Sequence, residues 1–415
     1  MSESASVSPS DNHAMRQTSS RRIAPVLGAL GTLGPLSIDM YLPGMPQIAS
    51  DLAVDAGAIQ FSLMTFFAGL MVGQLFYGPL SDRMGRKRMI YVGLALFVIA
   101  SLGCALATTA GQLTGWRFVQ GLGGSIGMVI GLAMIRDVYT GRAAAGLVAM
   151  MMVVQGIAPI VAPLLGTAIL AIAPWQAMFV LLAVCGIVCA ALTALVLPET
   201  RLPELRATSH PSAALRNYVR LLGGRHFIPF AGVTALAMGG FFAYLAGSSF
   251  VFISVHGLSP TAYSLLFAVN AFGLMIGAQI SPRLLGRFRP QAIMRAALAV
   301  YAAAALALVA LEWFGGASLV SLSVLLFVVI TAMAFVLPLG SVMALESYGA
   351  IAGTAAALMG ALNFGAGTVA SFAVGAAADG TARPMLVVIA ACSLVACLIA
   401  FRAFPGAGHA APAKA

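Results

Sequence analysis

Residues 69–88 have the sequence GLMVGQLFYGPLSDRMGRKR, an apolar segment that ends in a turn rich in basic residues. A weaker copy, GLMIGAQISPRLLGRFRP, occupies residues 273–290. The first glycines of the two copies, Gly69 and Gly273, are separated by about half of the chain, so each copy lies at a corresponding point of its own half. Such a duplication indicates the parallel internal repeat of a membrane transporter.

The composition independently indicates a membrane protein. Hydrophobic residues make up 61% of the chain and charged residues only 8%, which leaves too little polar surface for a soluble particle of this size. A membrane-spanning helix needs about 20 predominantly apolar residues. The twelve stretches that meet this requirement are 23–43, 59–80, 89–108, 112–134, 145–170, 175–197, 227–254, 261–284, 291–311, 317–342, 351–378 and 382–404.

These stretches form two sets of six on either side of a polar segment. We therefore predict an all-α polytopic membrane protein with twelve transmembrane helices in two six-helix bundles. The expected parts are an N-terminal tail (1–22), a first bundle (23–197), a linker (198–226), a second bundle (227–404) and a C-terminal tail (405–415). No cleavage site for a signal peptide follows the first span.

Basic residues outside the spans and near their ends are distributed very unevenly. The opposite side of the predicted topology has only Arg383, whereas the N-terminus, the even-numbered connections and the C-terminal end hold all the others: Arg16, Arg21, Arg22, Arg83, Arg86, Lys87, Arg88, Arg136, Arg142, Arg201, Arg206, Arg216, Arg220, Arg225, Arg283, Arg287, Arg289, Arg295, Arg402 and Lys414. Because cytoplasmic loops retain basic residues, we predict that both termini are cytoplasmic. Membrane topology also explains the net charge of +10 without nucleic-acid binding.

Several kinds of chemistry lack their usual residues. All five cysteines fall inside apolar spans without a CxxC pattern, and four of the five histidines lie in tails or loops. No GxxxxGK[ST] or GxSxG motif is present. We therefore expect no metal, no cofactor and no enzymatic activity, and any pumping would use an ion gradient.

Apart from the basic residues near span ends already named, two ionisable residues, Asp39 and Arg117, lie inside the predicted spans. Each costs about 2.5–3.5 kcal/mol or more at the bilayer centre, which usually marks a functional role. Their positions along the first and fourth spans predict a similar depth, where both could face one central cavity. The alternative is a salt bridge that only clamps two helices.

An acid in an apolar cavity suits proton exchange. Desolvation favours its neutral form, whereas a nearby arginine favours the carboxylate. Ionised Asp39 would bind a cationic or hydrogen-bonding substrate and protonated Asp39 would release it. Such competition for one site is the minimal mechanism of antiport.

The segment GPLSDRMGRKR, residues 78–88, resembles the signature between helices two and three of the major facilitator superfamily. Asp82 can accept hydrogen bonds from the free amides of a neighbouring helix N-terminus, and Arg86 and Arg136 are available as charge partners. Gly85 permits a tight turn. These contacts would latch the two halves on the cytoplasmic side, although the basic residues could serve topology alone. The predicted gating residues here are Asp82, Arg83, Gly85, Arg86 and Arg136.

The fourth span contains RFVQGLGGSIG, residues 117–127, which resembles the superfamily's arginine motif RxxQGxGGA with Ser125 at the alanine position. Its glycines are interpreted as packing residues that allow close approach of another helix.

The fifth span contains VQGIAPIVAPLLG, residues 154–166, which resembles a motif of the exporter branch, with alanine where a second adjacent glycine or proline is often found. Proline bends a helix, and the small residues would pack against a partner, for which we expect the eleventh helix. Gly156, Pro159 and Pro163 are therefore predicted to gate the pathway.

The first span contains LGPLSIDMYLPGMPQIASDL, residues 33–52, which resembles the first-helix signature of drug exporters related to bicyclomycin and chloramphenicol resistance transporters. Asp39 matches that family's membrane-embedded acid. The resemblance implies a proton-coupled exporter of small amphiphilic drugs, with Asp39 carrying the proton and Arg117 tuning it.

Substrate contacts are expected from aromatic, methionine and amide side chains, although such residues usually only pack. An apolar wall with few polar points suits bulky amphiphiles rather than sugars. The predicted substrate-binding residues are Asp39, Gln60, Met64, Phe67, Met151, Gln155, Phe241, Phe242, Tyr244, Asn270 and Asn363.

Two other functions remain open on the sequence alone. The first is transport of a metabolite such as a nucleoside, an amino acid or a sugar-like compound, and the second is a non-transporting receptor. The expected partners are a small-molecule substrate, protons and the lipid bilayer. We expect a monomer in the bacterial inner membrane.

Overall fold

The computed structural model describes residues 9–207 and 211–404, and this part of the chain is helical without strands. It contains twelve helices long and apolar enough to span a membrane, which confirms the predicted fold class. The first six spans are α1 (Pro9–Asp39) with η1 (Leu42–Gly44) and α2 (Met45–Asp51), α3 (Ala56–Met84), α4 (Arg86–Ala105), α5 (Ala110–Gly124) with α6 (Ile126–Val138), α7 (Gly141–Leu170) and α8 (Gln176–Val196). The last six are α11 (Phe227–Ser249) with the π-helix η2 (Phe250–Val255), α12 (Pro260–Leu285), α13 (Pro290–Trp313), α14 (Leu319–Leu345) with η3 (Glu346–Ile351), α15 (Ala352–Ala376) and α16 (Arg383–Ala403).

The linker between the sixth and seventh spans contains two short helices, α9 (Pro203–Ala207) and α10 (Pro211–Leu222). Residues 1–8 of the predicted N-terminal tail and the whole predicted C-terminal tail, which includes Lys414, lie outside the described residues. The side chains of Arg16, Arg21 and Arg22 also lie outside that description.

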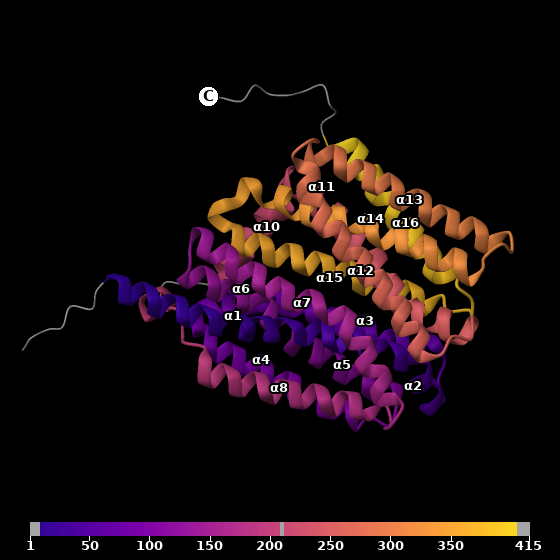
Figure 1. Cartoon of the computed structure of the whole chain (residues 1–415), viewed down its shortest axis with the longest axis horizontal. Coiled ribbons are helices and arrows are strands. Elements are labelled where there is room, and N and C mark those ends of the chain that lie inside the picture. Colours follow the sequence, from indigo (N-terminus) through magenta and orange to yellow (C-terminus); the bar gives the residue numbers. More distant parts are fainter. Residues whose placement is uncertain (1–8, 208–210, 405–415) are drawn as a thin grey trace, which may run out of the picture.

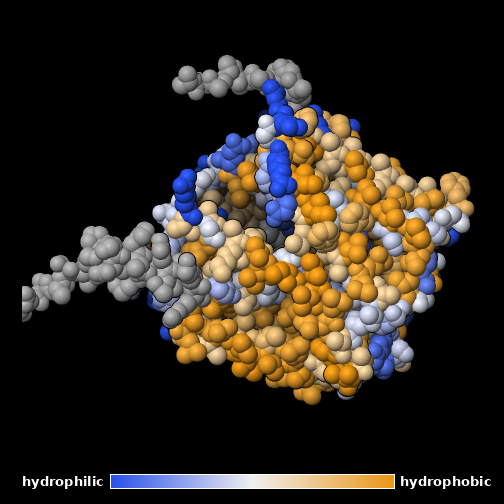
Figure 2. Space-filling model, in the orientation of Figure 1, coloured by the Kyte–Doolittle hydropathy of each residue, from blue (hydrophilic) through white to orange (hydrophobic). Residues whose placement is uncertain are grey.

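The two halves lie side by side with their helices roughly along one direction (Figure 1). The chain-order colours separate into an indigo-to-magenta half that contains α1–α8 and an orange-to-yellow half that contains α11–α16. The halves meet mainly where α3 packs on α15 and where α7 packs on α12. Hydrophobic residues cover most of the visible surface, with hydrophilic residues in separate patches (Figure 2). Such a surface suits contact with lipid.

Helix ends follow local chemistry. Asp55 begins α3 by accepting a hydrogen bond from the backbone amide of Ala58 at 2.7 Å, the usual role of an acid at a helix N-terminus. Gly85 separates α3 from α4 with φ 98°, which a residue with a Cβ rarely adopts. The tight turn predicted at Gly85 is therefore present. We call the end of the molecule at this turn the basic end.

The halves touch at the end opposite the basic end and separate at the basic end. At the opposite end, a Cβ on Gly57 of α3 would lie 2.6 Å from the carbonyl oxygen of Gly375 on α15, and the rings of Phe61 and Phe372 stack with centroids 5.7 Å apart. At the basic end, a cavity of about 760 Å³ separates α3 and α6 from η3 and the start of α15. The structure is thus open toward the basic end.

Within the first half, glycines permit the closest helix contacts. A Cβ on Gly121 of α5 would collide with the carbonyl oxygen of Phe66 on α3, and a Cβ on Gly123 would lie 2.5 Å from the backbone nitrogen of Phe97 on α4. The interpretation of these motif glycines as packing residues agrees with this geometry. Gly115, two turns earlier on α5, has no atom near its Cβ position.

We expect Gly121→Val to destabilise the protein, because overpacking a close helix contact costs about 1–3 kcal/mol or more. Gly115→Val is the matched control on the same helix and should leave stability nearly unchanged. Thermal unfolding of both variants in detergent would measure the difference, and equal unfolding temperatures would contradict the packing role.

Candidate functional site

A cavity of about 170 Å³ lies between the two halves. Its walls are mostly apolar and aromatic, with polar groups from Asp39, Tyr244 and Asn270. The other residues that line it are Pro35, Ile38, Leu70, Met128, Pro159, Met238, Phe241, Phe242, Leu245, Phe267, Ala271, Leu274, Ile330 and Phe364. Because both halves contribute, a movement between them would change the cavity.

Asp39 reaches the cavity at the point where the first helix stops. It is the last residue of α1, and Pro43 in the following η1 cannot donate a backbone hydrogen bond to a continuing α-helix. The Asp39 residue is 5% exposed. It makes no hydrogen bond or ion pair with the described residues, so its carboxyl group is free to engage a ligand.

The second half supplies the other polar groups of the cavity. The Asn270 side-chain nitrogen donates to the Tyr244 hydroxyl at 2.9 Å. The Asn270 Oδ1 atom is buried without a hydrogen-bond partner in the described part of the chain. Leaving a buried acceptor unpaired costs about 1–3 kcal/mol, so this amide oxygen suits a hydrogen-bond donor on a ligand.

Aromatic rings form the apolar surface around these groups. The rings of Phe242 and Phe364 stack with centroids 5.6 Å apart, and those of Tyr244 and Phe267 stack at 6.0 Å. Aromatic faces accommodate flat apolar ligands and cations. The cavity can therefore take an amphiphile whose polar group meets Asp39 or Asn270.

Arg117 does not line this cavity, so the prediction that it faces the same cavity as Asp39 is wrong. Its guanidinium carbon lies 4.2 Å from the centroid of the Phe66 ring and 4.6 Å from that of Tyr41. Aromatic faces offset part of the cost of burying a cation. The alternative of an Asp39–Arg117 salt bridge is not found among the described residues.

Arg117 instead completes the end of the first helix. Its Nη1 donates to the Ser37 carbonyl at 3.1 Å. That carbonyl lacks its helical partner, because the Tyr41 amide bonds to Ile38 at 3.2 Å. A cation at a helix C-terminus is favourable. Arg117 thus holds α1 two residues before Asp39, and Gln120 accepts a second hydrogen bond from the same Nη1 at 2.7 Å.

The other predicted substrate residues divide by location. Phe241, Phe242, Tyr244 and Asn270 line the cavity as expected, together with Asp39. Phe67 lies behind it, with its ring centroid 4.2 Å from that of Phe242. Gln60 lines a separate cavity at the opposite end.

The remaining four are not among the residues that line the cavity: Met64, Met151, Gln155 and Asn363. Gln155 packs against Gly31 of α1, and Met151 packs against Gly131 of α6. The prediction for Met151 and Gln155 is wrong in location because α7 turns this face toward helices of its own half. Met64 and Asn363 lie on α3 and α15. Phe267, which the sequence reasoning missed, lies one turn before Asn270 and shares its helix face.

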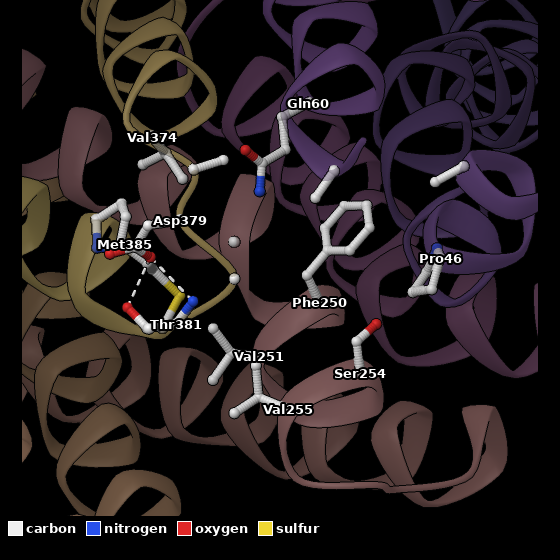
Figure 3. A pocket seen from close by; sticks show the side chains of 16 residues that line it. Pro46, Gln60, Phe250, Val251, Ser254, Val255, Val374, Asp379, Thr381 and Met385 are labelled. Atoms are coloured by element: carbon white, nitrogen blue, oxygen red, sulfur yellow. Dashed lines mark hydrogen bonds between the residues drawn. The ribbon is translucent and has the colours of Figure 1, made fainter. Parts of the chain in front are cut away.

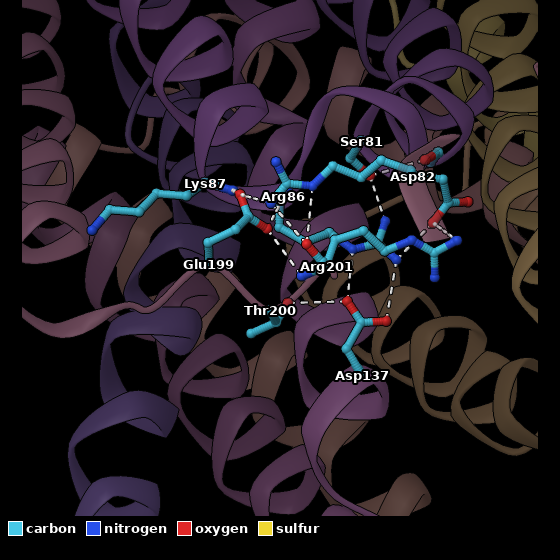
Figure 4. A network of polar contacts seen from close by, with 10 residues as sticks. Ser81, Asp82, Arg86, Lys87, Asp137, Glu199, Thr200 and Arg201 are labelled. Atoms are coloured by element: carbon cyan, nitrogen blue, oxygen red, sulfur yellow. Dashed lines mark hydrogen bonds and ion pairs between the residues drawn. The ribbon is translucent and has the colours of Figure 1, made fainter. Parts of the chain in front are cut away.

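The basic turn forms an ionic network around Arg86 (Figure 4). The Arg86 guanidinium contacts the carboxylate of Asp82 at 2.7 Å and that of Asp137 at 2.9 Å. The backbone amides of Arg86 and Lys87, at the start of α4, donate to the Glu199 carboxylate at 2.9 and 3.1 Å. An acid at these free amides stabilises the helix start.

This network corrects two expectations for the gate. All of its members belong to the first half or to the adjoining start of the linker, so it does not latch the two halves in this structure. Asp137, which the sequence reasoning missed, pairs with Arg86. The neighbouring Arg136 lines the large cavity at the basic end, as does Asp82. Arg83 is exposed.

The fifth span also differs from expectation. Its main neighbours are α1 and α12 rather than the eleventh helix, α15. Pro159 lines the central cavity, and the Pro163 carbonyl accepts a hydrogen bond from Ser264 of α12 at 3.1 Å. A Cβ on Gly156 would meet no atom, so this glycine is not required for packing here.

We expect Arg86→Ala to lower stability by at least about 2 kcal/mol, because hydrogen bonds to charged groups contribute about 1.5–3 kcal/mol each. Arg83→Ala, an exposed arginine of the same turn, is the matched control and should have little effect. Thermal unfolding in detergent would compare them. Similar losses for both variants would show that charge in the turn, rather than the Arg86 network, stabilises this end.

Comparison with known proteins agrees with this architecture. The family model of the Major Facilitator Superfamily matches residues 27–372. An uncharacterized MFS-type transporter YdgK of Bacillus subtilis is 36% identical over 88% of this chain and 90% of its own. A bicyclomycin resistance protein homolog of Haemophilus influenzae is 29% identical over 90% of this chain and 93% of its own. The multidrug resistance protein MdtL of Escherichia coli is 32% identical over 68% of this chain and 71% of its own.

Solved structures show the same fold at low sequence identity. A D-xylose-proton symporter superposes with a TM-score of 0.73 at 16% identity and covers 92% of this chain and 98% of its own. A bacterial homolog of the human lysosomal transporter Spinster, in an inward-facing and occupied conformation, superposes with a TM-score of 0.70 at 15% identity, over 92% and 96%. Together with the family match, these findings show that the chain is a multi-pass membrane transporter of the major facilitator superfamily.

Proposed function

We propose that this protein exports small amphiphilic compounds, such as antibiotics, in exchange for protons, and that Asp39 carries the proton. The observation that supports this most directly is an acid without a protein partner at the edge of an aromatic cavity between two movable halves. The names of two relatives, a bicyclomycin resistance protein homolog and a multidrug resistance protein, support the same substrate class.

The chemistry of exchange follows from the surroundings of Asp39. A carboxylate buried without a partner is costly, and its position at the C-terminus of α1 adds an unfavourable helix dipole. Either a proton or a cationic or hydrogen-bonding substrate relieves that cost. Because both ligands use one carboxyl group, binding of one displaces the other.

We further propose that the basic end faces the cytoplasm of a bacterial inner membrane, as the distribution of arginines predicts. The structure would then represent the state that receives substrate from inside the cell. On closure, Asp82 would approach the first amides of α15, since both ends line the cavity between the halves. We also propose that the protein functions as a monomer, since residues from both halves of one chain line the central cavity.

The composition of the cavity argues against a sugar-like metabolite. Its polar side chains are Asp39, Tyr244 and Asn270, and the rest of the lining is apolar or aromatic. A polyhydroxylated substrate would leave most of its hydroxyl groups without hydrogen bonds, and each such loss is costly. Amphiphilic compounds avoid this cost.

Purified protein in liposomes with an enclosed pH-sensitive dye would test the proposal. With a proton gradient imposed, addition of ethidium or chloramphenicol should release protons through the wild type. Asp39→Asn should abolish the release, because an amide cannot exchange a proton in this range. Asp51→Asn, an exposed acid at the end of α2, is the control and should behave as the wild type does.

Retained proton release by Asp39→Asn would exclude Asp39 as the coupling acid. Substrate accumulation by the wild type without proton movement would exclude antiport while leaving transport in place.

A further inference from the structure

A second cavity of about 270 Å³ lies at the end opposite the basic end (Figure 3). Its walls come from both halves, since α2 and α3 contribute Pro46 and Gln60 while η2 and α16 contribute Phe250, Val251 and Met385. It shares no lining residue with the central cavity. Its volume lies just below the range of about 300–1,000 Å³ for ligand pockets.

Met45 and Ser249 are adjacent in sequence to Pro46 and Phe250, which line the second cavity, and we call the contact between Met45 and Ser249 the layer between the cavities. The Ser249 hydroxyl of α11 donates to the Met45 sulfur of α2 at 3.7 Å, and both residues are fully buried. The helix α11 and its continuation η2 line the central cavity at Tyr244 and Leu245 and the second cavity from Gly247 onward. The unbranched Met45 side chain can change conformation readily, so this layer can open without a large helix movement.

Gln60 supplies an unpaired polar group to the second cavity. The residue is 3% exposed, and its Oε1 atom is buried without a hydrogen-bond partner in the described part of the chain. Figure 3 shows its amide directed toward the space between Phe250 and Val374. A buried amide oxygen without a partner costs about 1–3 kcal/mol, which a ligand with a hydrogen-bond donor would remove.

A carboxylate stands at the rim of the same cavity. Asp379 Oδ1 accepts hydrogen bonds from the Thr381 amide at 2.9 Å and from the Thr381 hydroxyl at 2.7 Å. These hydrogen bonds hold the pKa of the exposed Asp379 carboxyl below its ordinary value. The rim therefore carries a carboxylate, and the charge of Arg383 also lowers the pKa of that carboxyl. The Nε atom of the nearby Arg383 lies 4.0 Å from the Glu312 Oε1 atom, and the Arg383 guanidinium lies over the Trp313 ring.

The apolar wall comes largely from an irregular helix segment. Phe250, Val251, Ser254 and Val255 line the cavity and belong to the π-helix η2. Isolated π-helical turns occur frequently at functional sites. With Met385 of α16 opposite, they form a surface for the apolar body of a ligand.

We propose that this cavity is an exit subsite for amphiphilic organic cations, in which Gln60 accepts a hydrogen bond from the substrate and Asp379 attracts its positive charge. The proposal rests on the export function above and narrows its substrate class. A substrate that leaves Asp39 would pass the layer formed by Met45 and Ser249 and be held here before release.

Equilibrium binding of ethidium, followed by its fluorescence, would test the subsite on the full chain in lipid nanodiscs. The wild type should bind ethidium at two sites. Asp39→Asn should lose the central site and keep the second. In that background, Gln60→Leu should weaken binding about fivefold or more, whereas Gln60→Glu should strengthen it about tenfold, equivalent to about 1.4 kcal/mol.

Neutral chloramphenicol is the matched probe, and its affinity should not increase with Gln60→Glu. If Gln60→Glu gains affinity for ethidium but not for chloramphenicol, misfolding of the variant cannot be the cause. Asp51→Asn should leave binding of both probes unchanged.

The subsite is wrong if Asp39→Asn abolishes all ethidium binding, if no protein binds ethidium, or if the Gln60 variants bind it equally in that background. Failure of the export function would look different. In that case the second site would still bind ethidium, but the wild type would release no protons on addition of the compound.

Discussion

A guanidinium buried in a membrane is stabilised by hydrogen-bond acceptors and aromatic faces, and Arg117 finds some of both at the end of the first helix. Its Nη1 donates to the orphan Ser37 carbonyl, and its guanidinium carbon lies over the rings of Phe66 and Tyr41. If the helix continued, Ser37 would already be paired. Arg117 therefore compensates for the backbone hydrogen bond that the break after Asp39 removes. The end of α1 at this break places Asp39 at the edge of the central cavity.

This arrangement separates two functions that a salt bridge would combine. A direct ion pair would hold Asp39 in its charged form and remove it from a ligand. Since Arg117 acts through the backbone of α1, it positions Asp39 while leaving the carboxyl group without a partner. Nη1 of Arg117 is hydrogen-bonded, whereas Nε and Nη2 have no hydrogen-bond partner in the described part of the chain. The acid is left to exchange.

Much of the fold could be predicted from sequence because it depends on quantities that a sequence contains. Runs of about 20 apolar residues give the spans, and Gly85 marks the tight turn at φ 98°. The rotation of each helix is less accessible, since a span that contacts both lipid and protein is apolar all round. Tyr244 and Asn270 do line the cavity. The uncertain rotation explains why Gln155 and Arg117, which were also expected to face it, do not. Asp137 and Glu199 were missed because their partner, Arg86, is distant in sequence.

The ionic network and the two cavities together suggest how the halves move. The network joins α3, α4, α6 and the start of the linker within one half, so these elements should move as one body. The contacts between the halves at the opposite end are different in kind. There, Gly57 meets Gly375 through backbone atoms, and Thr167 shares a 2.7 Å hydrogen bond with Ser264. Neutral contacts of this type cost less to break than buried ion pairs.

The stronger interactions thus hold each body rigid, while the weaker ones close the pathway between the bodies. Separation at the opposite end would disrupt the Met45–Ser249 contact and join the central cavity to the second one. Closure at the basic end would at the same time reduce the large cavity lined by Asp82 and Arg136. A rocking motion about the central cavity links these two events, because both cavities and the gate between them are bounded by the same pair of rigid halves.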